Sequence, residues 1–310
     1  MKRVDVILAT YNGEKFLKAQ LDSLLNQSYP LHRIFLRDDL SSDQTQDIIS
    51  EYKKKHNDKI IVVPSSTRLG VIANFSSLLQ QIDHQTDYLM FCDQDDIWLS
   101  DKVESTLNKM LQEEKISKPN TPILLHTDLK LVDGQLKEIS TSYIHYSGLN
   151  PESGSTFSRL LTQNCVTGCT MMLNKPLIEL TDHVPNGIVM HDWWIALVAA
   201  CFGKVVFLNK PTILYRQHGN NTVGAKKNFS LQTFLRSWKR KKTPSTQQAQ
   251  IFYQKYHNQM SLEQIATITA YIQLSKQNFW KRRYQMIRHK FYKHGILRNA
   301  VAFVFAKKYV

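Results

Sequence analysis

Short apolar segments alternate with amphipathic segments through the first third of the chain, and this alternation limits the fold more than any other feature. The apolar segments have the length of strands and lie at residues 4–10, 33–39, 59–64 and 88–93. Each is followed by a segment with helical periodicity, at residues 14–26, 41–56, 70–82 and 99–114. Strands and helices at this spacing are typical of βαβ units, so the sequence predicts a parallel sheet with helices on both faces.

The pattern becomes less regular after residue 120. Strand-like segments occur at residues 122–133, 168–174, 204–209 and 212–218, and helical segments at residues 157–164 and 192–202. The composition shifts near residue 224, where few acidic residues remain. The sequence therefore predicts an α/β domain over residues 1–223, with a mixed, mainly parallel, Rossmann-like sheet, and a basic, mainly helical region over residues 224–310.

Charge is distributed unevenly between these two regions. Residues 224–310 contain 18 Lys and Arg but one acidic residue, Glu263, whereas residues 1–223 contain 22 basic and 25 acidic residues. The formal net charge of +14 thus belongs to the C-terminal region. Two regions with different partners are indicated.

Polar clusters follow three of the predicted strands at the points where those strands end. They are Thr-Tyr-Asn (10–12), Asp-Asp (38–39) and Asp-Gln-Asp-Asp (93–96). Ligands of open parallel sheets bind outside the carboxyl ends of the strands. Carboxylates gathered there repel one another, and Mg²⁺ or Mn²⁺, which prefers carboxylate and phosphate oxygens, relieves that repulsion. A cation that holds a diphosphate is therefore predicted.

The same acidic residues have a purely structural interpretation. Asp95 or Asp96 would cap the following segment, and Asp38 and Asp39 would form an Asx-turn. The occurrence of three such clusters on the strands of one predicted sheet favours the ligand site.

The segment VILATYNGEKFLKAQLDSLLNQSYPLHRIFLRDDLSSDQT resembles the N-terminal half of family 2 glycosyltransferases, which have the GT-A fold. The matching pattern is an apolar strand ending in Thr-Tyr-Asn, then SLLNQ, then DDxSxDxT, and later a D-x-D motif at a strand end. The resemblance covers roughly residues 4–220 and implies a GT-A nucleotide-diphospho-sugar transferase fold.

The resemblance assigns the binding of the nucleotide sugar to residues at these strand ends. Thr10 and Tyr11, with the adjoining Asn12, would line the pocket for the base and ribose. Asp39 would bond the edge of the pyrimidine. Asp93 would face the ribose or the metal ion.

The resemblance also implies a metal site. Asp95 would be the direct ligand of a Mg²⁺ or Mn²⁺ that bridges the two phosphates, and His218 would be a further ligand of the diphosphate or the metal. A lone histidine is also commonly structural. Arg216 would pair with a carboxylate or a phosphate. Many relatives have an Arg where this chain has Ala73, and Arg68 is a candidate substitute for that contact.

The motif HDWW at residues 191–194 carries the expected general base. By its position Asp192 would take the proton from an acceptor hydroxyl, which then attacks the anomeric carbon with inversion. The alternative is a capped helix with Trp193 and Trp194 in the core.

The motifs DQDDIW, HDWW and YRQHGNN together resemble the bacterial rhamnosyltransferase-like branch of the family. That branch uses dTDP-L-rhamnose in the synthesis of cell-wall or surface polysaccharide. A UDP-hexose donor is the alternative within this enzyme class. A nucleotidyltransferase is a poorer match, because it would need a glycine-rich, lysine-bearing phosphate loop near the first strand and TYNGEK has a single glycine. A nucleic-acid-binding protein is the alternative outside the enzymes.

The C-terminal region mixes aromatic and basic residues, most densely at residues 279–293. On a helix, Trp280, Tyr284, Ile287 and Phe291 fall on one arc. The basic residues outside that arc are Arg282, Arg283, Arg288, Lys290 and Lys293. This layout is typical of an interfacial helix on anionic lipid.

Two alternatives remain for this region, a helical cap with a solvated basic face and a nucleic-acid groove. We expect a nucleotide-sugar donor, a saccharide or lipid-linked acceptor and an anionic membrane surface as partners, and no nucleic acid. No run of about 18 apolar residues occurs and the start does not resemble a signal peptide. The expected location is the cytoplasm, peripherally at the inner face of the cell membrane.

Overall fold

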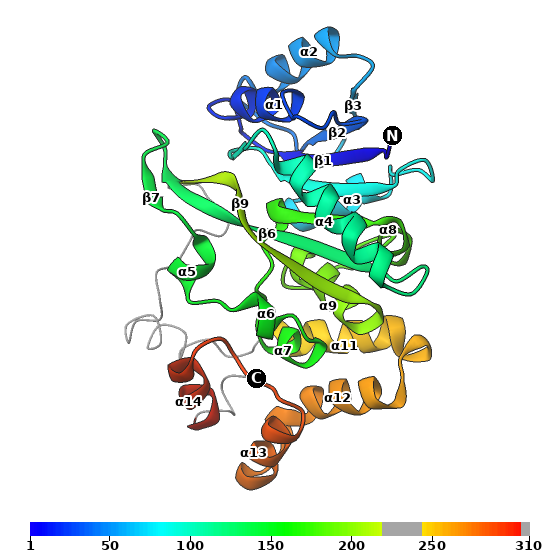
Figure 1. The fold of residues 1–310 in the computed structure, drawn as a ribbon, viewed down its shortest axis with the longest axis vertical. Helices are drawn as coiled ribbons and strands as arrows, with labels where there is room; N and C mark the ends of the chain where they lie inside the picture. The colour runs from blue at the N-terminus through cyan, green and yellow to red at the C-terminus, as the bar shows by residue number, and fades with distance from the viewer. Residues whose placement is uncertain (219–243, 305–310) are drawn as a thin grey trace.

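The fold is built on one nine-stranded sheet, seen in a computed structural model that describes residues 1–218 and 244–304. The strands are β1 (Val4–Thr10), β2 (Arg33–Asp38), β3 (Ile60–Val62), β4 (Tyr88–Asp93), β5 (Ile97–Trp98), β6 (Ile123–Asp133), β7 (Glu138–Ser140), β8 (Met171–Asn174) and β9 (Lys204–Gln217). Their order is β3-β2-β1-β4-β8-β6-β9-β5, with β7 paired to β6 (Figure 1).

Helices cover both faces of this sheet and extend beyond one end of it (Figure 1). Their bounds are α1 (Leu17–Leu25), α2 (Thr45–Lys55), α3 (Val71–Leu79), α4 (Lys102–Ile116), α5 (Tyr143–Ser147), α6 (Pro151–Gly154), α7 (Phe157–Thr162), α8 (Lys175–Leu180), α9 (His191–Phe202), α11 (Pro244–Tyr256), α12 (Leu262–Gln273), α13 (Phe279–Arg288) and α14 (Ile296–Val304). Apolar residues of α1, α2 and α4 form one core cluster with the sheet, and those of α3, α7, α8 and α9 form the other.

The four strands predicted first along the chain, β1 to β4, pair in parallel in the order β3-β2-β1-β4. Both faces of β1 and β4 are buried, which is why their sequences are largely apolar, with the buried Asp5 as the exception in β1. The second half of the sheet is mixed, since β8 runs antiparallel to β4 and β6, whereas β9 runs parallel to β6. The expected α/β architecture with a mixed sheet is confirmed.

One prediction about the second half needs correction. The segments 204–209 and 212–218 were expected as two strands, but they form the single strand β9. The register of β9 against β6 shifts where Asp128 pairs with Pro211. Proline has no N–H for the ladder, so the interruption that suggested two strands is an irregularity within one.

The C-terminal helices continue the core of the sheet domain. Phe252 and Tyr256 of α11 pack on Trp194 of α9, with ring centroids 5.4 and 5.9 Å apart. The described part of residues 224–310 is mainly helical, as expected. The predicted boundary at residues 223–224 falls in the range 219–243, outside the described residues.

The expected lipid-facing helix differs from the observed α13. This helix ends at Arg288, so Phe291 lies beyond it and is buried, with 2% of its surface exposed. Arg282 and Arg283 are also buried rather than solvated, because both guanidinium groups donate to backbone carbonyls. Across residues 1–218 and 244–304, no helix combines the length and apolar character needed to cross a bilayer.

Candidate active site

The polar clusters of the first strands lie along one edge of the sheet. Thr10 at the end of β1 pairs with Asp38 of β2, and Ala9 pairs with Asp93 of β4. Neighbouring strands are about 4.8 Å apart, so the three clusters are neighbours in space. The predicted convergence of these strand ends is thus confirmed.

Gln94, the middle residue of the D-x-D motif, holds the loop after β1 in place. Its Oε1 accepts hydrogen bonds from Thr10 Oγ1 (2.5 Å) and from the Tyr11 N–H (2.8 Å), and its amide donates to the Tyr11 carbonyl (3.0 Å). A Cβ on Gly13 would lie 2.5 Å from the same oxygen, so glycine permits this approach. No sequence pattern indicated this role of Gln94.

Asn12 connects the loops after β1 and β2. Its backbone has a φ of 48°, its N–H donates to Ser41 Oγ (2.8 Å), and its side-chain oxygen accepts from the Ser42 N–H (2.9 Å). Asp38 accepts from the Ser41 N–H (2.9 Å). The local turn expected at Asp38 in the structural interpretation therefore forms, and it holds the loop after β2 in place at this edge of the sheet.

Asp39 is almost fully buried and fixes a third loop. One carboxylate oxygen accepts from Arg37 Nη1 (2.9 Å) and from the Leu69 N–H (2.7 Å), and the other accepts from the Gly70 N–H (2.7 Å). Burial acts to raise the pKa of Asp39, but these donors together lower it, so the carboxylate is ionised. Its contact to a pyrimidine stays a prediction.

The loop that Asp39 holds presents Arg68 to Tyr11. The Arg68 guanidinium carbon lies 3.9 Å from the centre of the Tyr11 ring. Arg37 Nη2 donates to the Thr67 carbonyl (3.0 Å) and so braces the loop from the other side. A cation therefore stands beside the expected nucleotide pocket even though Ala73 removes the arginine that many relatives have.

Acidic groups concentrate where β4 ends. One oxygen each from Asp93 and Asp96 and the Cys169 sulfur lie within 4.8 Å of one another. Burial, Asp95 and Asp192 raise the pKa of Asp93 to about 7, and burial followed by the Asp95 and Asp93 charges raises that of Asp96. This mutual repulsion and the hard oxygen donors fit a Mg²⁺ or Mn²⁺ ion. Burial keeps the Cys169 thiol protonated by raising its pKa, so it is not an anionic ligand.

The two expected metal ligands meet in this region. His218 Nε2 lies 2.8 Å from Asp95 Oδ2. The end of β9 is held there by the Arg216 N–H, which donates to Asp96 Oδ1 (3.2 Å), and by stacking of His218 on Phe16 at 4.9 Å. Asp95 and His218 were expected here from the sequence, and Asp96 only as a member of the acidic cluster or as a cap. Phe16 was not expected in the site.

Asp192 lies in the first turn of α9 and close to the acidic cluster, since its charge helps to raise the pKa of Asp93. Burial raises the pKa of Asp192 itself to about 7, although the N–H groups of Trp193 and Gly168 act in the opposite direction. Trp194 is fully buried in the core, as the structural interpretation of HDWW expected. The structural interpretation thus holds for Trp194, whereas Trp193 is only partly buried and α9 has no side-chain cap. The role of Asp192 as general base stays a prediction.

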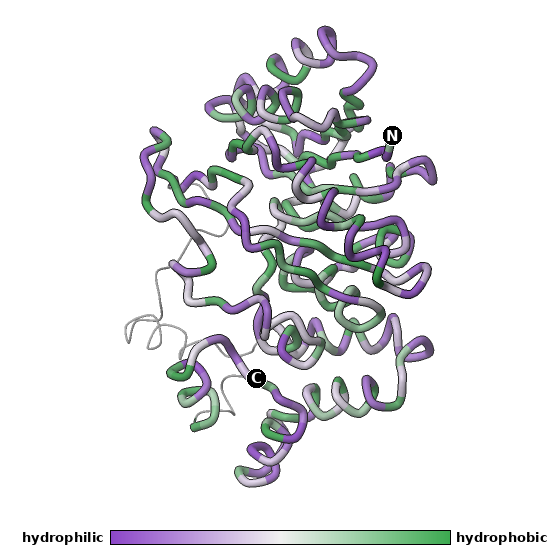
Figure 2. Tube along the Cα trace, in the orientation of Figure 1, coloured by the Kyte–Doolittle hydropathy of each residue, from purple (hydrophilic) through white to green (hydrophobic). Residues whose placement is uncertain are grey.

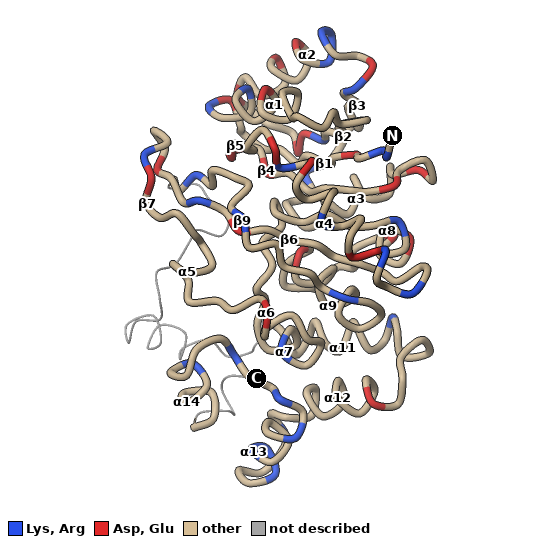
Figure 3. The backbone as a smooth tube through the Cα atoms, viewed as in Figure 1, with Lys and Arg blue, Asp and Glu red and all other residues tan. Residues whose placement is uncertain are grey.

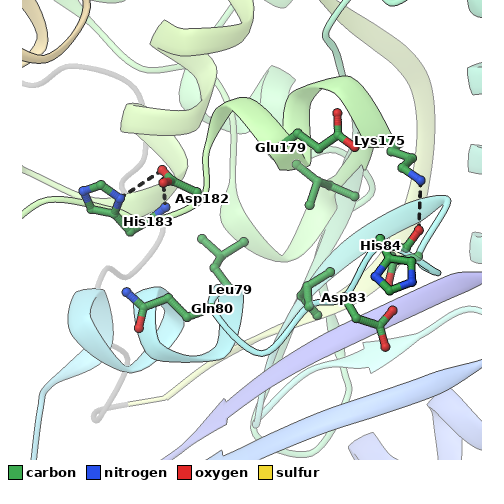
Figure 4. A pocket seen from close by; sticks show the side chains of 11 residues that line it. Leu79, Gln80, Asp83, His84, Lys175, Glu179, Asp182 and His183 are labelled. Atoms are coloured by element: carbon green, nitrogen blue, oxygen red, sulfur yellow. Dashed lines mark hydrogen bonds and ion pairs between the residues drawn. The ribbon is translucent and has the colours of Figure 1, made fainter.

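A separate cavity of about 420 Å³ lies between the loop after α3 and helix α8 (Figure 4). Lys175 donates to the His84 carbonyl on one side of it, and His183 pairs with Asp182 on the other. His84 precedes β4, whereas Asp93 ends it, so this cavity lies at the opposite end of the strand from the acidic cluster. Within the described residues, its lining contains none of the expected site residues.

A comparison with protein families matches residues 5–180 to the model described as glycosyl transferase family 2. The dTDP-rhamnosyl transferase RfbG of Shigella flexneri is 29% identical over 293 residues, which cover 89% of this chain and 94% of the relative. The UDP-Glc:alpha-D-GlcNAc-diphosphoundecaprenol beta-1,3-glucosyltransferase WfgD of Escherichia coli is 25% identical over 57% of this chain and 62% of its own length.

Two solved structures are similar in fold. TarS 1–349 of S. aureus in complex with UDP-GlcNAc has a TM-score of 0.53 at 17% identity and covers 93% of this chain and 89% of its own. The mannosyltransferase PcManGT of Pyrobaculum calidifontis, in complex with GDP-Man and Mn²⁺, has a TM-score of 0.53 at 14% identity and covers 99% and 88%. The GT-A fold expected from the sequence is confirmed.

Proposed function

Because the chain belongs to glycosyl transferase family 2, we propose that it is a metal-dependent inverting enzyme that transfers L-rhamnose from dTDP-rhamnose. The acceptor is a saccharide or a lipid-linked saccharide in the synthesis of a cell-wall or surface polysaccharide. The observation that carries the proposal is the convergence of Asp93, Asp95, Asp96 and Asp192 at one edge of the sheet. The similarity to RfbG along nearly its whole length supports the choice of donor.

The nucleotide binds across the ends of β1, β2 and β4. Tyr11 and Thr10 line the base and ribose pocket, in the position that Gln94 fixes. Asn12 and Asp39 complete the wall, where Asp39 would bond the edge of the pyrimidine. Arg68 adds a positive charge beside Tyr11, which suits the negative charge of a nucleoside diphosphate.

The diphosphate end of the donor lies at the acidic cluster. Asp95 and His218 are the proposed metal ligands, and Asp93 faces the ribose or the ion. Mg²⁺ or Mn²⁺ bound there would offset the charge that develops on the departing nucleoside diphosphate. The Mn²⁺ in the PcManGT complex supports this choice of ion.

Asp192 is the general base. Its carboxylate accepts the proton of an acceptor hydroxyl while that oxygen forms a bond to the anomeric carbon of the donor. The bond from that carbon to the phosphate oxygen breaks, and its electron pair leaves on dTDP. The attack comes from the face opposite the diphosphate, so the configuration inverts. A pKa of about 7 gives Asp192 a basicity suited to neutral pH.

The proposal also specifies the type of acceptor and the cellular location. WfgD is named for a diphosphoundecaprenol-linked acceptor, and its similarity supports a lipid-linked acceptor for this enzyme. Such an acceptor has its lipid in the bilayer, so the enzyme works in the cytoplasm at the inner face of the cell membrane. A UDP-hexose is the alternative donor, favoured by the UDP-Glc in the name of WfgD and the UDP-GlcNAc bound to TarS.

The decisive experiment presents the purified chain with dTDP-rhamnose, UDP-glucose, UDP-GlcNAc and GDP-mannose, each with Mn²⁺ and with a membrane extract as a source of acceptor. Release of dTDP above that of UDP and GDP is expected. Preferential release of UDP would favour the alternative donor. The absence of any nucleotide release, in a protein that remains folded by circular dichroism, would reject the proposed activity.

A further inference from the structure

Large apolar side chains are exposed most densely on the last two described helices. The described residues contain 15 exposed large hydrophobic side chains, and seven of them fall between residues 279 and 304. We call these seven the α13–α14 face: Phe279, Trp280, Tyr284, Ile287, Ile296, Leu297 and Val304. Trp280 is 79% exposed and Ile296 is 91% exposed. Exposed apolar residues gathered in this way indicate an interaction surface.

The two helices that carry this face are joined to each other. Arg283 of α13 donates to the Phe279 carbonyl (2.9 Å) and to the Val304 carbonyl of α14 (2.8 Å). Its guanidinium also lies over the Phe303 ring, 5.4 Å from the centroid. The buried arginine therefore fixes α13 against α14, and the α13–α14 face belongs to one structural unit.

The charge around this face has one sign. Residues 264–304 contain no acidic residue, and Lys276, Lys281, Arg288 and Lys290 are exposed among or beside the apolar residues. Figure 3 shows basic residues along α13 and α14, and Figure 2 shows apolar residues interspersed with them. An apolar surface ringed by cations complements a bilayer with anionic headgroups.

We propose that the α13–α14 face is a docking surface for an anionic lipid bilayer. Trp280, Ile296 and Leu297 enter the boundary between headgroups and acyl chains, and the exposed lysine and arginine side chains contact the headgroups. A nucleic acid is the poorer partner, because strongly exposed aliphatic side chains such as Ile296 and Leu297 offer nothing to phosphates or bases. The inference deepens the proposed function, since it names the surface that brings the enzyme to a lipid-linked acceptor.

The docking surface is fastened to the part of the domain that leads to Asp192. Arg298 of α14 donates to the Ser147 carbonyl (2.9 Å), and the ring nitrogen of His294 accepts from the Asn150 N–H (2.9 Å). Thr162 Oγ1 donates to the Tyr292 carbonyl (2.9 Å). The segment 147–162 then continues to Gly168, whose N–H donates to Asp192. Docking therefore sets the orientation of the active site relative to the membrane.

The test is flotation of the full-length protein with vesicles, without substrates. Wild type is expected to float with vesicles of phosphatidylcholine and phosphatidylglycerol, more weakly at high salt, and not with phosphatidylcholine alone. The double variant Trp280→Glu/Leu297→Glu is expected to bind at least about tenfold more weakly. The matched control is Leu262→Glu on α12, a leucine that is 86% exposed outside the face, and it should bind as wild type does.

Equal flotation of the double variant and wild type would overturn the docking surface, as would wild type that does not float. Preferential binding to a single-stranded oligonucleotide over anionic vesicles would likewise overturn it. Thermal unfolding confirms that each variant is folded. The inactive variant Asp95→Asn should float normally, because the docking surface does not include the active site. Vesicle binding by a wild type that shows no turnover would therefore reject only the proposed activity. Turnover without vesicle binding rejects only the docking surface.

Discussion

The imidazole of His218 meets the carboxylate of Asp95, with 2.8 Å between Nε2 and Oδ2, although 123 positions separate them in the chain. The pair joins the turn after β4 to the end of β9. Both side chains are largely shielded from solvent, so their interaction is stronger than that of a surface pair. The site is thus assembled from the first parallel half of the sheet and from the last strand.

Asp95→Asn should abolish metal-dependent turnover. The substitution removes the carboxylate charge but keeps the size of the side chain, so the unfolding temperature should change little. We expect the rate with Mn²⁺ to fall by about 100-fold or more, because a metal ion supplies several kcal/mol of charge stabilisation. The measurement is turnover as a function of Mn²⁺ concentration. Asp101→Asn, in the turn before α4, is the control and should respond to Mn²⁺ as wild type does. If Asp95→Asn also responds to Mn²⁺ as wild type does, the metal ligand is another group.

The pH dependence of transfer should report Asp192. Its folded-state pKa is raised to about 7 from 3.8, chiefly by burial, and a base must be unprotonated to act. The rate should therefore rise with pH and level off above the pKa, and fall about tenfold per pH unit below it. Because a bound divalent cation favours the carboxylate, the acidic limb with Mn²⁺ should lie at or below pH 7.

Asp192→Asn provides the test of that assignment. We expect it to bind the donor as wild type does, measured by calorimetry, and to lose transfer to the acceptor. Transfer at the wild-type rate, or an unchanged acidic limb in the residual activity, would mean that a different group takes the proton.

Arg68→Ala should weaken donor binding without changing the chemical step. The guanidinium stacks on Tyr11, in the proposed nucleotide pocket, so we expect the donor KM to rise about tenfold while kcat stays within about twofold. Steady-state kinetics with varied donor concentration separates the two constants. Lys54→Ala, an exposed cation on α2, is matched in charge and should leave both constants unchanged. A fall in kcat alone would contradict a donor-binding role.

Arg282→Ala should destabilise the protein although it removes a basic residue from a basic helix. The Arg282 guanidinium donates to the carbonyls of Leu274 (2.9 Å), Ser275 (3.3 Å) and Gln277. Its loss leaves buried acceptors unpaired, which costs about 1–3 kcal/mol of unfolding free energy. Urea denaturation measures this cost. The exposed neighbour Lys281→Ala should change stability by less than about 0.5 kcal/mol; equal effects would place Arg282 in solvent.

The elements that could be predicted from the sequence are those with a strong local pattern. β1 and β4 were predicted with their observed bounds, because both faces of each strand are buried and, apart from Asp5, each position is apolar until the strand ends. β5 and α5 were missed because segments of two and five residues carry no measurable periodicity. β9 was divided in two because the sequence cannot distinguish an interrupted strand from a loop.

The candidate site divides in a similar way. Asp39, Asp93, Asp95 and Asp192 could be selected because each follows or begins a recognisable element. Gln94 and Arg68 gain their positions from contacts with Tyr11, which depend on how three loops meet. Arg68 could be named only as a candidate substitute for the arginine missing at Ala73, and the residue type of Gln94 is common at loop positions and gives no signal in isolation.

The sequence alone determined the alternation of strands and helices and the acidic residues at the strand ends, because hydrophobic periodicity and strand termini are local properties. Only the tertiary structure decided that His218 reaches Asp95, that Arg282 and Arg283 turn inward, and that the exposed apolar residues of α13 and α14 belong to one unit. The reason is physical. Burial and pairing depend on which distant segments pack together, and a buried guanidinium and an exposed one have the same letter in the sequence.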